Sequence, residues 1–105
     1  MKFTITARNF ELSDAIKEYA TKRLEKLKHF EHYIMDAHMI MEKDKGSSII
    51  ELTLSVKHSP IASRVNNPDI YLGINDVVRK VERQLDKYEG KFHERKRLAQ
   101  KTRRK

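Results

Sequence analysis

Each predicted strand of this chain is apolar on one face only, and this feature constrains the fold more than any other. Across residues 2–8, Phe3, Ile5 and Ala7 alternate with polar or charged residues, which is the period of two typical of a half-buried strand. Further strands are predicted at 36–43, 50–57 and 61–66. A sheet made of such strands buries one side and exposes the other, so all helices must pack on the same side.

Two segments show the three- and four-residue spacing of apolar residues that is typical of an amphipathic helix. The first should begin after Ser13, a favoured N-cap residue, and should run to about His29. The second should span residues 69–92, after a turn and cap at residues 67–69, and its Gly73 should permit close packing. The apolar stripe of this second helix consists of Ile70, Ile74, Val77, Val78, Val81, Leu85, Tyr88 and Phe92.

The predicted elements follow the order β-α-β-β-β-α. A right-handed crossover should make the first two strands parallel, while turns at 44–47 and 58–60 should make the last three an antiparallel meander. We therefore predict an α+β fold, a two-layer sandwich in which a four-stranded mixed sheet carries both helices on one face. Residues 1–93 should form this domain. Residues 94–105, where the apolar period fails, should form a basic tail that is partly helical at its start and disordered later.

The positive charge is unevenly distributed along the chain. There are 23 Lys or Arg against 15 Asp or Glu, a formal net charge of +8, which favours a polyanionic partner. Residues 91–105 hold eight of these cations and one acid, so residues 1–90 carry a net charge of only +1. A basic surface on the domain must therefore come from sorting the charges onto different faces. The tail itself could bind RNA nonspecifically or serve as a solubilising extension.

The cations of both helices are sorted by face. On the second helix they recur at steps of three, four and four residues and stack as one ridge: Lys80, Arg83, Lys87 and Lys91. Its opposite flank holds Glu82, Asp86 and Glu89. The first helix carries Lys22, Arg23 and Lys26 on one flank. We predict that these seven cations bind an RNA phosphate backbone and that the acids are turned away on both helices.

The position of Arg23 also bears on how the helices are placed. It lies within the apolar sector of the first helix, so this edge should face the seam between the helices and not the sheet. The alternative interpretation of all seven cations is that they are solvated helix-face charges with some i,i+4 pairing, worth roughly a few tenths of a kcal/mol per pair. Two ridges on the same layer favour the RNA-binding interpretation.

Other function classes lack their signatures in this sequence. Cysteine is absent and the five histidines are scattered apart from His29 and His32, so no metal or cofactor site is predicted. No Gly-rich phosphate loop, nucleophile elbow or acid pair is present, so we do not expect an enzyme. No apolar run approaches a membrane span and no signal peptide is visible, so we expect a cytoplasmic protein without a membrane partner. The aromatic residues that should belong to the core are Tyr19, Tyr71, Tyr88 and Phe92.

Several short motifs resemble those of a known family. They are Phe3-Thr4-Ile5-Thr6, Leu12-Ser13-Asp14-Ala15-Ile16, Lys26-Leu27, and Asp69-Ile70-Tyr71-Leu72-Gly73-Ile74-Asn75 followed by Lys80, Arg83-Gln84-Leu85 and Lys87. The pattern Asp-x-Tyr-x-x-Ile leading into a long basic helix is quite specific. Over residues 1–91 the chain thereby resembles the bacterial ribosome hibernation-promoting factors and the ribosome-associated inhibitor, protein Y.

The resemblance implies a fold like that of double-stranded-RNA-binding domains and a translation inhibitor that acts on the ribosome. Family members bind the small (30S) subunit between head and body, mainly through 16S rRNA, across the decoding channel of mRNA and tRNA. Ribosomes would be inactivated reversibly during stress or stationary phase. The positions that match the family's RNA-binding residues are Arg23, Lys26, Lys80, Arg83, Lys87 and Lys91. Lys22 is added from helix geometry alone.

The chain departs from the family's subtypes in length. It has no room for the second domain with which long forms join two ribosomes, so forming 100S ribosome dimers would need a partner such as ribosome modulation factor. Its short basic tail matches neither the short promoting form nor the inhibitor, and the subtype stays open. We expect a monomer off the ribosome. The competing hypotheses are a general duplex-RNA-binding module or RNA chaperone without ribosome preference, and an RNA-processing enzyme, which the missing catalytic constellation disfavours.

Overall fold

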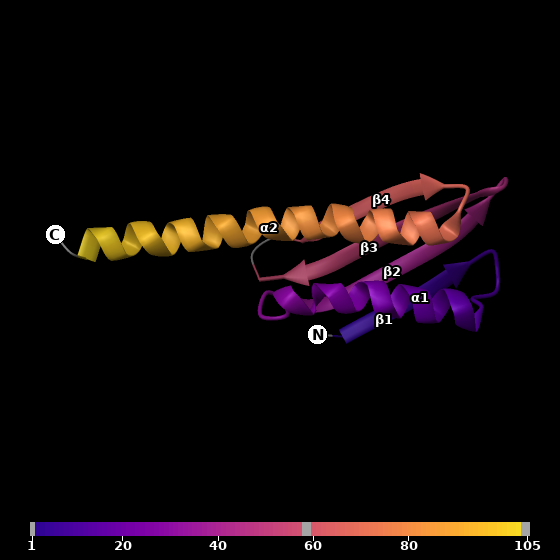
Figure 1. Cartoon of the computed structure of the whole chain (residues 1–105), viewed down its shortest axis with the longest axis horizontal. Coiled ribbons are helices and arrows are strands. Elements are labelled where there is room, and N and C mark those ends of the chain that lie inside the picture. The colour runs from indigo at the N-terminus through magenta and orange to yellow at the C-terminus, as the bar shows by residue number, and fades with distance from the viewer. Residues whose placement is uncertain (1, 58–59, 104–105) are drawn as a thin grey trace.

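The structure, a computed structural model, describes residues 2–57 and 60–103, with side chains up to residue 90. Its strands are β1 (Lys2–Arg8), β2 (Ile34–Asp44), β3 (Ser47–Val56) and β4 (Ile61–Asn67). Its helices are α1 (Asp14–Glu25), the short 3-10 helix η1 (Lys26–Phe30) and α2 (Ile70–Arg103) (Figure 1). The predicted order β-α-β-β-β-α is confirmed. No helix among the described residues is both long enough and apolar enough to span a membrane.

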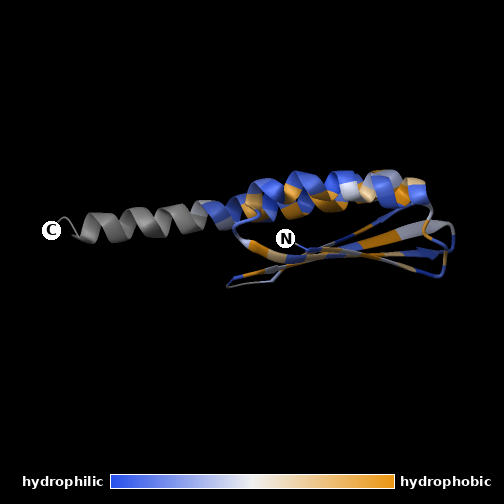
Figure 2. Ribbon diagram, turned by 90° about the horizontal axis from the view of Figure 1, so that it is seen from below, coloured by the Kyte–Doolittle hydropathy of each residue, from blue (hydrophilic) through white to orange (hydrophobic). Residues whose placement is uncertain are grey.

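The sheet has the predicted mixed topology. Its strand order is β1-β2-β3-β4, with β1 parallel to β2 and the other two pairs antiparallel. The β2–β3 turn has positive φ at both central residues, 49° at Lys45 and 78° at Gly46. This is the two-residue hairpin geometry whose twist matches that of the flanking strands. Both helices lie on the same face of the sheet, with their apolar sides toward it (Figure 2).

The helix starts are fixed by side-chain caps at the predicted places. The Ser13 hydroxyl accepts a hydrogen bond from the Ile16 amide at 3.2 Å and so caps α1. For α2, the Asp69 carboxylate accepts from the amides of Tyr71 at 2.9 Å and Leu72 at 3.4 Å. These bonds satisfy amides that have no partner within the helix and place a negative charge at its positive end.

The two helices end differently from the prediction. The first was expected to stay α-helical to about His29, but α1 ends at Glu25 and η1 follows. Leu27 and Phe30 are both buried, and the three-residue turn of a 3-10 helix points residues three apart in the same direction. The second continues to Arg103, beyond the predicted end at 92 and through most of the predicted tail. The division into a domain at 1–93 and a tail at 94–105 stays a prediction.

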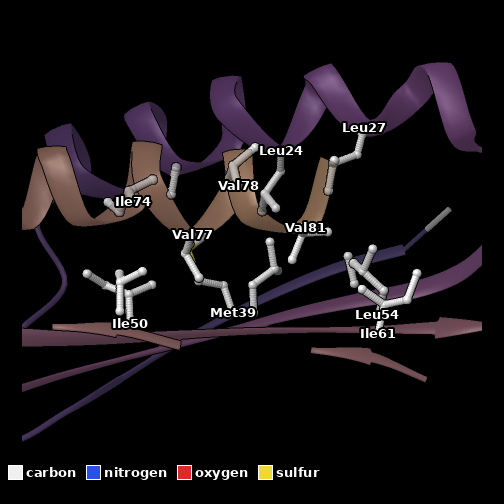
Figure 3. Close-up of a cluster of buried hydrophobic side chains, with 14 of the residues drawn as sticks. Leu24, Leu27, Met39, Ile50, Leu54, Ile61, Ile74, Val77, Val78 and Val81 are labelled. Carbon is white, nitrogen blue, oxygen red and sulfur yellow. The ribbon is translucent and has the colours of Figure 1, made fainter. Parts of the chain in front are cut away.

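The core fills the space between the helices and the sheet. Side chains from α1, η1 and α2 meet the inward residues of the strands (Figure 3). Its largest fully buried members include Leu24, Leu27, Met39, Ile50, Leu54, Ile74, Val77, Val78 and Val81. Gly73 makes close packing possible, as predicted, because a Cβ built there would lie 2.3 Å from Cδ1 of Ile50. The helices therefore sit at fixed positions on the sheet, and their outer faces are the surface available to a partner.

Candidate nucleic-acid interface

Lys80, Arg83 and Lys87, named here the α2 ridge, follow one another along α2, with Lys80 and Lys87 toward the outer edge of the sheet and Arg83 at the crest of the helix. Gln84 belongs to the same flank as Lys80, and its side-chain amide donates a 3.0 Å hydrogen bond to the carbonyl oxygen of Ala62. Ala62 is in β4, which is an edge strand of the sheet. This bond satisfies a backbone carbonyl of the edge strand β4 and fixes how α2 is rotated about its own axis. Lys80 and Lys87 are therefore on the side of α2 that faces away from α1.

The acidic flank of α2 faces the seam with α1. Tyr71 marks this direction, because its ring contacts that of Tyr19 in α1 edge to face, with centroids 5.1 Å apart. Glu89 lies 18 residues further on, which is five full helical turns, and therefore points the same way, while half-buried Glu82 points within roughly 20° of it. The acids of α2 therefore lie on the flank opposite Lys80, and this acidic flank is the one that faces α1.

The far end of this seam is also acidic. Tyr33, just before β2, packs against Tyr88 of α2 with ring centroids 5.4 Å apart. Burial, followed by the nearby carboxylate of Glu89, raises the pKa of the Tyr33 phenol. Glu89 therefore lies close to the connection between η1 and β2.

Lys22, Arg23 and Lys26, named here the α1 cluster, border the same seam from the other side. The Arg23 guanidinium lies 5.0 Å from the centroid of the Tyr19 ring, the ring that contacts Tyr71. The prediction that this edge of α1 faces the seam is thus confirmed. Lys22 forms an exposed i,i+4 ion pair with Glu18 at 3.5 Å, and Lys26 is exposed at the start of η1.

The structure therefore places the predicted residues in two groups, one on each helix. The α1 cluster is at the seam, and the α2 ridge extends from the crest of α2 to its far flank. The crest carries Arg79, an exposed cation that the prediction missed. The signal was present in the sequence, because Arg79 precedes Arg83 by four residues and so extends the ridge by one turn. The side chain of Lys91 lies outside the described residues.

The cations of the α2 ridge can contact phosphates directly. Lys80, Arg83 and Lys87 are all exposed, and none of them is within ion-pair distance of an acid in the described part of the chain. Cations that are not neutralised by neighbours can contact phosphates without first breaking an ion pair. The α1 cluster differs, since Lys22 is already paired. No group of three or more potential metal ligands occurs among the described residues.

Comparison with known proteins identifies the family. A model described as Sigma 54 modulation protein / S30EA ribosomal protein matches residues 3–93, so the chain belongs to this family. The relatives include the ribosome hibernation promoting factor of Salmonella typhimurium, 27% identical over 88% of this chain and 97% of that protein. They also include the ribosome-associated factor Y of Haemophilus influenzae, 27% identical over 91% of this chain and 90% of that protein.

Solved structures share the fold. A ribosomal subunit interface protein from Coxiella burnetii superposes with a TM-score of 0.80 at 24% identity, covering 86% of this chain and 99% of that one. The N-terminal domain of protein Y from Thermus thermophilus gives a TM-score of 0.77 at 21% identity, covering 84% and 99%. The α+β class and the family resemblance predicted from the motifs are both confirmed.

Proposed function

We propose that this protein is a translation inhibitor that binds the 30S ribosomal subunit, mainly through 16S rRNA, and reversibly inactivates ribosomes under stress or in stationary phase. The observation that carries the proposal is the α2 ridge, three exposed cations in a row along a long helix, with no acid within ion-pair distance among the described side chains. Membership of the family and relatives named for ribosome hibernation support the ribosome as the partner. The place of action is then the cytoplasm.

The mechanism is occlusion. Lys80, Arg83 and Lys87 neutralise rRNA phosphates, with Arg79 and Lys91 extending the row, and the α1 cluster contacts a second stretch of backbone across the crest of α2. The body of the domain then fills the decoding channel between the head and body of the subunit and excludes mRNA and tRNA. No covalent step is involved, so release restores an active ribosome.

The opposite face of the domain supports the choice of the helical layer as the binding side. The outer side of the sheet places charges of opposite sign beside one another on adjacent strands. Arg8 of β1 is in register with Glu42 of β2, and Glu51 of β3 with Arg64 of β4. Because charges of opposite sign are neighbours here, the described residues of this face form no row of cations comparable to the α2 ridge.

Sedimentation with separated 30S and 50S subunits tests the proposal, with structured non-ribosomal RNA present as competitor. We expect the protein to pellet with 30S and to resist the competitor. Pelleting with both subunits, or removal by the competitor, would favour the general duplex-RNA-binding module or RNA chaperone. Failure to pellet with any RNA would contradict RNA binding altogether.

A further inference from the structure

A shallow depression of about 240 Å³ lies in the seam near the first turns of α1 and α2. Its walls are Ala15, Glu18, Tyr19, Lys22 and Tyr71. It is smaller than the roughly 300–1,000 Å³ of pockets that enclose drug-sized ligands, so its occupant must be a small planar group or part of a larger molecule. Its location on the helical layer, beside the α1 cluster, places it on the surface proposed to meet RNA.

Tyr71 contributes a partly exposed aromatic ring to this depression. It was expected in the core, but 39% of its surface is exposed. Its ring meets that of Tyr19 at 85°, an edge-to-face arrangement. In such a pair Tyr19 can cover at most one face of the Tyr71 ring, so at least one face is not covered by Tyr19. Tyr19 itself is also in contact with the Arg23 guanidinium. Tyr71 is therefore the ring on which a further planar group can stack.

The polar side chains that line the depression are suited to bind the phosphate and the base edge of a nucleotide. Lys22 is a cation at the rim, and its ion pair with Glu18 is exposed by about 70% on both sides, so exchanging it for a phosphate costs little. The Glu18 carboxylate can accept a hydrogen bond from an exocyclic amino group, which adenine, guanine and cytosine carry and uracil lacks.

We propose that the depression holds one unpaired nucleobase of the bound RNA, stacked on Tyr71, with its phosphate at Lys22 and an exocyclic amino group at Glu18. This inference rests on the proposed RNA-binding function and adds to it a contact with a base, whereas the ridge and cluster contact only backbone. Unstacked bases of single-stranded or bulged RNA commonly bind to exposed aromatic side chains in this way.

The test compares three variants in binding to 30S subunits. Tyr71→Ala should raise the Kd by roughly 5- to 100-fold, as expected for the loss of one base–aromatic stack. Tyr71→Phe keeps the ring and should stay within about twofold of the wild type, as should Leu72→Ala, a control at the neighbouring exposed residue. Thermal unfolding of each variant shows whether the fold is retained.

A second readout needs no variant and would not respond to a merely structural role of Tyr71. Ultraviolet crosslinking of the wild-type protein on 30S subunits, followed by trypsin and nuclease, should give a nucleotide adduct on peptide 65–79, in which Tyr71 is the only tyrosine. Wild-type Kd in Tyr71→Ala, or adducts confined to other peptides, would overturn the stacking site and leave the proposed function standing. Failure of the wild type to bind 30S would overturn both.

Discussion

Gly73 decides how closely α2 can approach the sheet. Its missing side chain leaves room for Ile50, whose Cδ1 would be 2.3 Å from a Cβ at this position. Ile50 is fully buried among core residues, so its methyl group has little space into which to move. A glycine inside a helix normally costs about 1 kcal/mol relative to alanine, and here that cost is offset by close packing.

Gly73→Ala should therefore lower the free energy of unfolding by about 1–2 kcal/mol, since overpacking outweighs the gain in helix propensity. Gly90→Ala is the matched control in the same helix, because a Cβ there meets no atom within 4 Å, and it should stabilise the protein by up to about 1 kcal/mol. Urea denaturation measures both.

Combining Gly73→Ala with Ile50→Val removes the methyl group responsible for the clash. The double variant should be more stable than the sum of the two single effects implies. Additive effects, or a stabilising Gly73→Ala, would show that the close approach is not the reason for glycine at this position.

At the scale of the elements, the rotation of each helix about its axis decides which charges meet. The Gln84–Ala62 hydrogen bond keeps one flank of α2 at the edge of the sheet, and the Tyr19–Tyr71 contact keeps the opposite flank at the seam. The acids of α2 consequently lie nearer to the α1 cluster than the α2 ridge does. The two groups of cations should therefore differ in strength as RNA ligands.

Removing two lysines from each group tests this difference. Lys80→Ala with Lys87→Ala should raise the Kd for 30S by roughly tenfold or more, because both side chains are exposed and have no ion-pair partner among residues 2–57 and 60–90. Lys22→Ala with Lys26→Ala should have a smaller effect, because the negative charges of Glu18 beside Lys22 and of half-buried Glu82 along the seam lower the positive potential that a phosphate meets there. An equal or larger effect of the second pair would contradict the assignment of the ridge as the main contact.

Most of the strands and helices, and their order in the sheet, could be predicted from the sequence. Period-two strands, the Ser13 and Asp69 caps and the turn at 44–47 are local signals, and the right-handed crossover rule supplies the sheet order. Which flank of α2 faces α1 could not be predicted, because it depends on how the long helix packs on β3 and β4. The exposure of Tyr71 was missed for a related reason, since it lies at the margin of the apolar stripe, where the neighbouring helix decides burial.

At the scale of the whole molecule, the charge distribution is one-sided. The helical layer carries two groups of cations and the tail adds seven more between residues 94 and 105, whereas the outer side of the sheet places opposite charges beside one another on adjacent strands. A domain of this kind should approach RNA in one orientation, with the tail increasing affinity without selecting a site.

Deleting residues 95–105 should accordingly weaken binding to 30S and flatten its salt dependence. Each phosphate contact that is lost should reduce the slope of log K against log salt concentration by roughly 0.7–0.9. The measurement is the Kd at several salt concentrations for the full chain and the truncated one. An unchanged slope would show that the tail makes no phosphate contacts.

The most direct test of the central claim is the affinity for 30S subunits after Lys80, Arg83 and Lys87 are all replaced by Glu. A matched variant reverses three exposed cations away from the helical layer, Arg8, Lys57 and Arg64, and so has the same net charge. Circular dichroism and thermal unfolding confirm that both are folded. We predict that the ridge variant no longer binds 30S, while the matched variant binds nearly as well as the wild type. Binding by a folded ridge variant at wild-type affinity, or equal losses in both variants, would contradict the account.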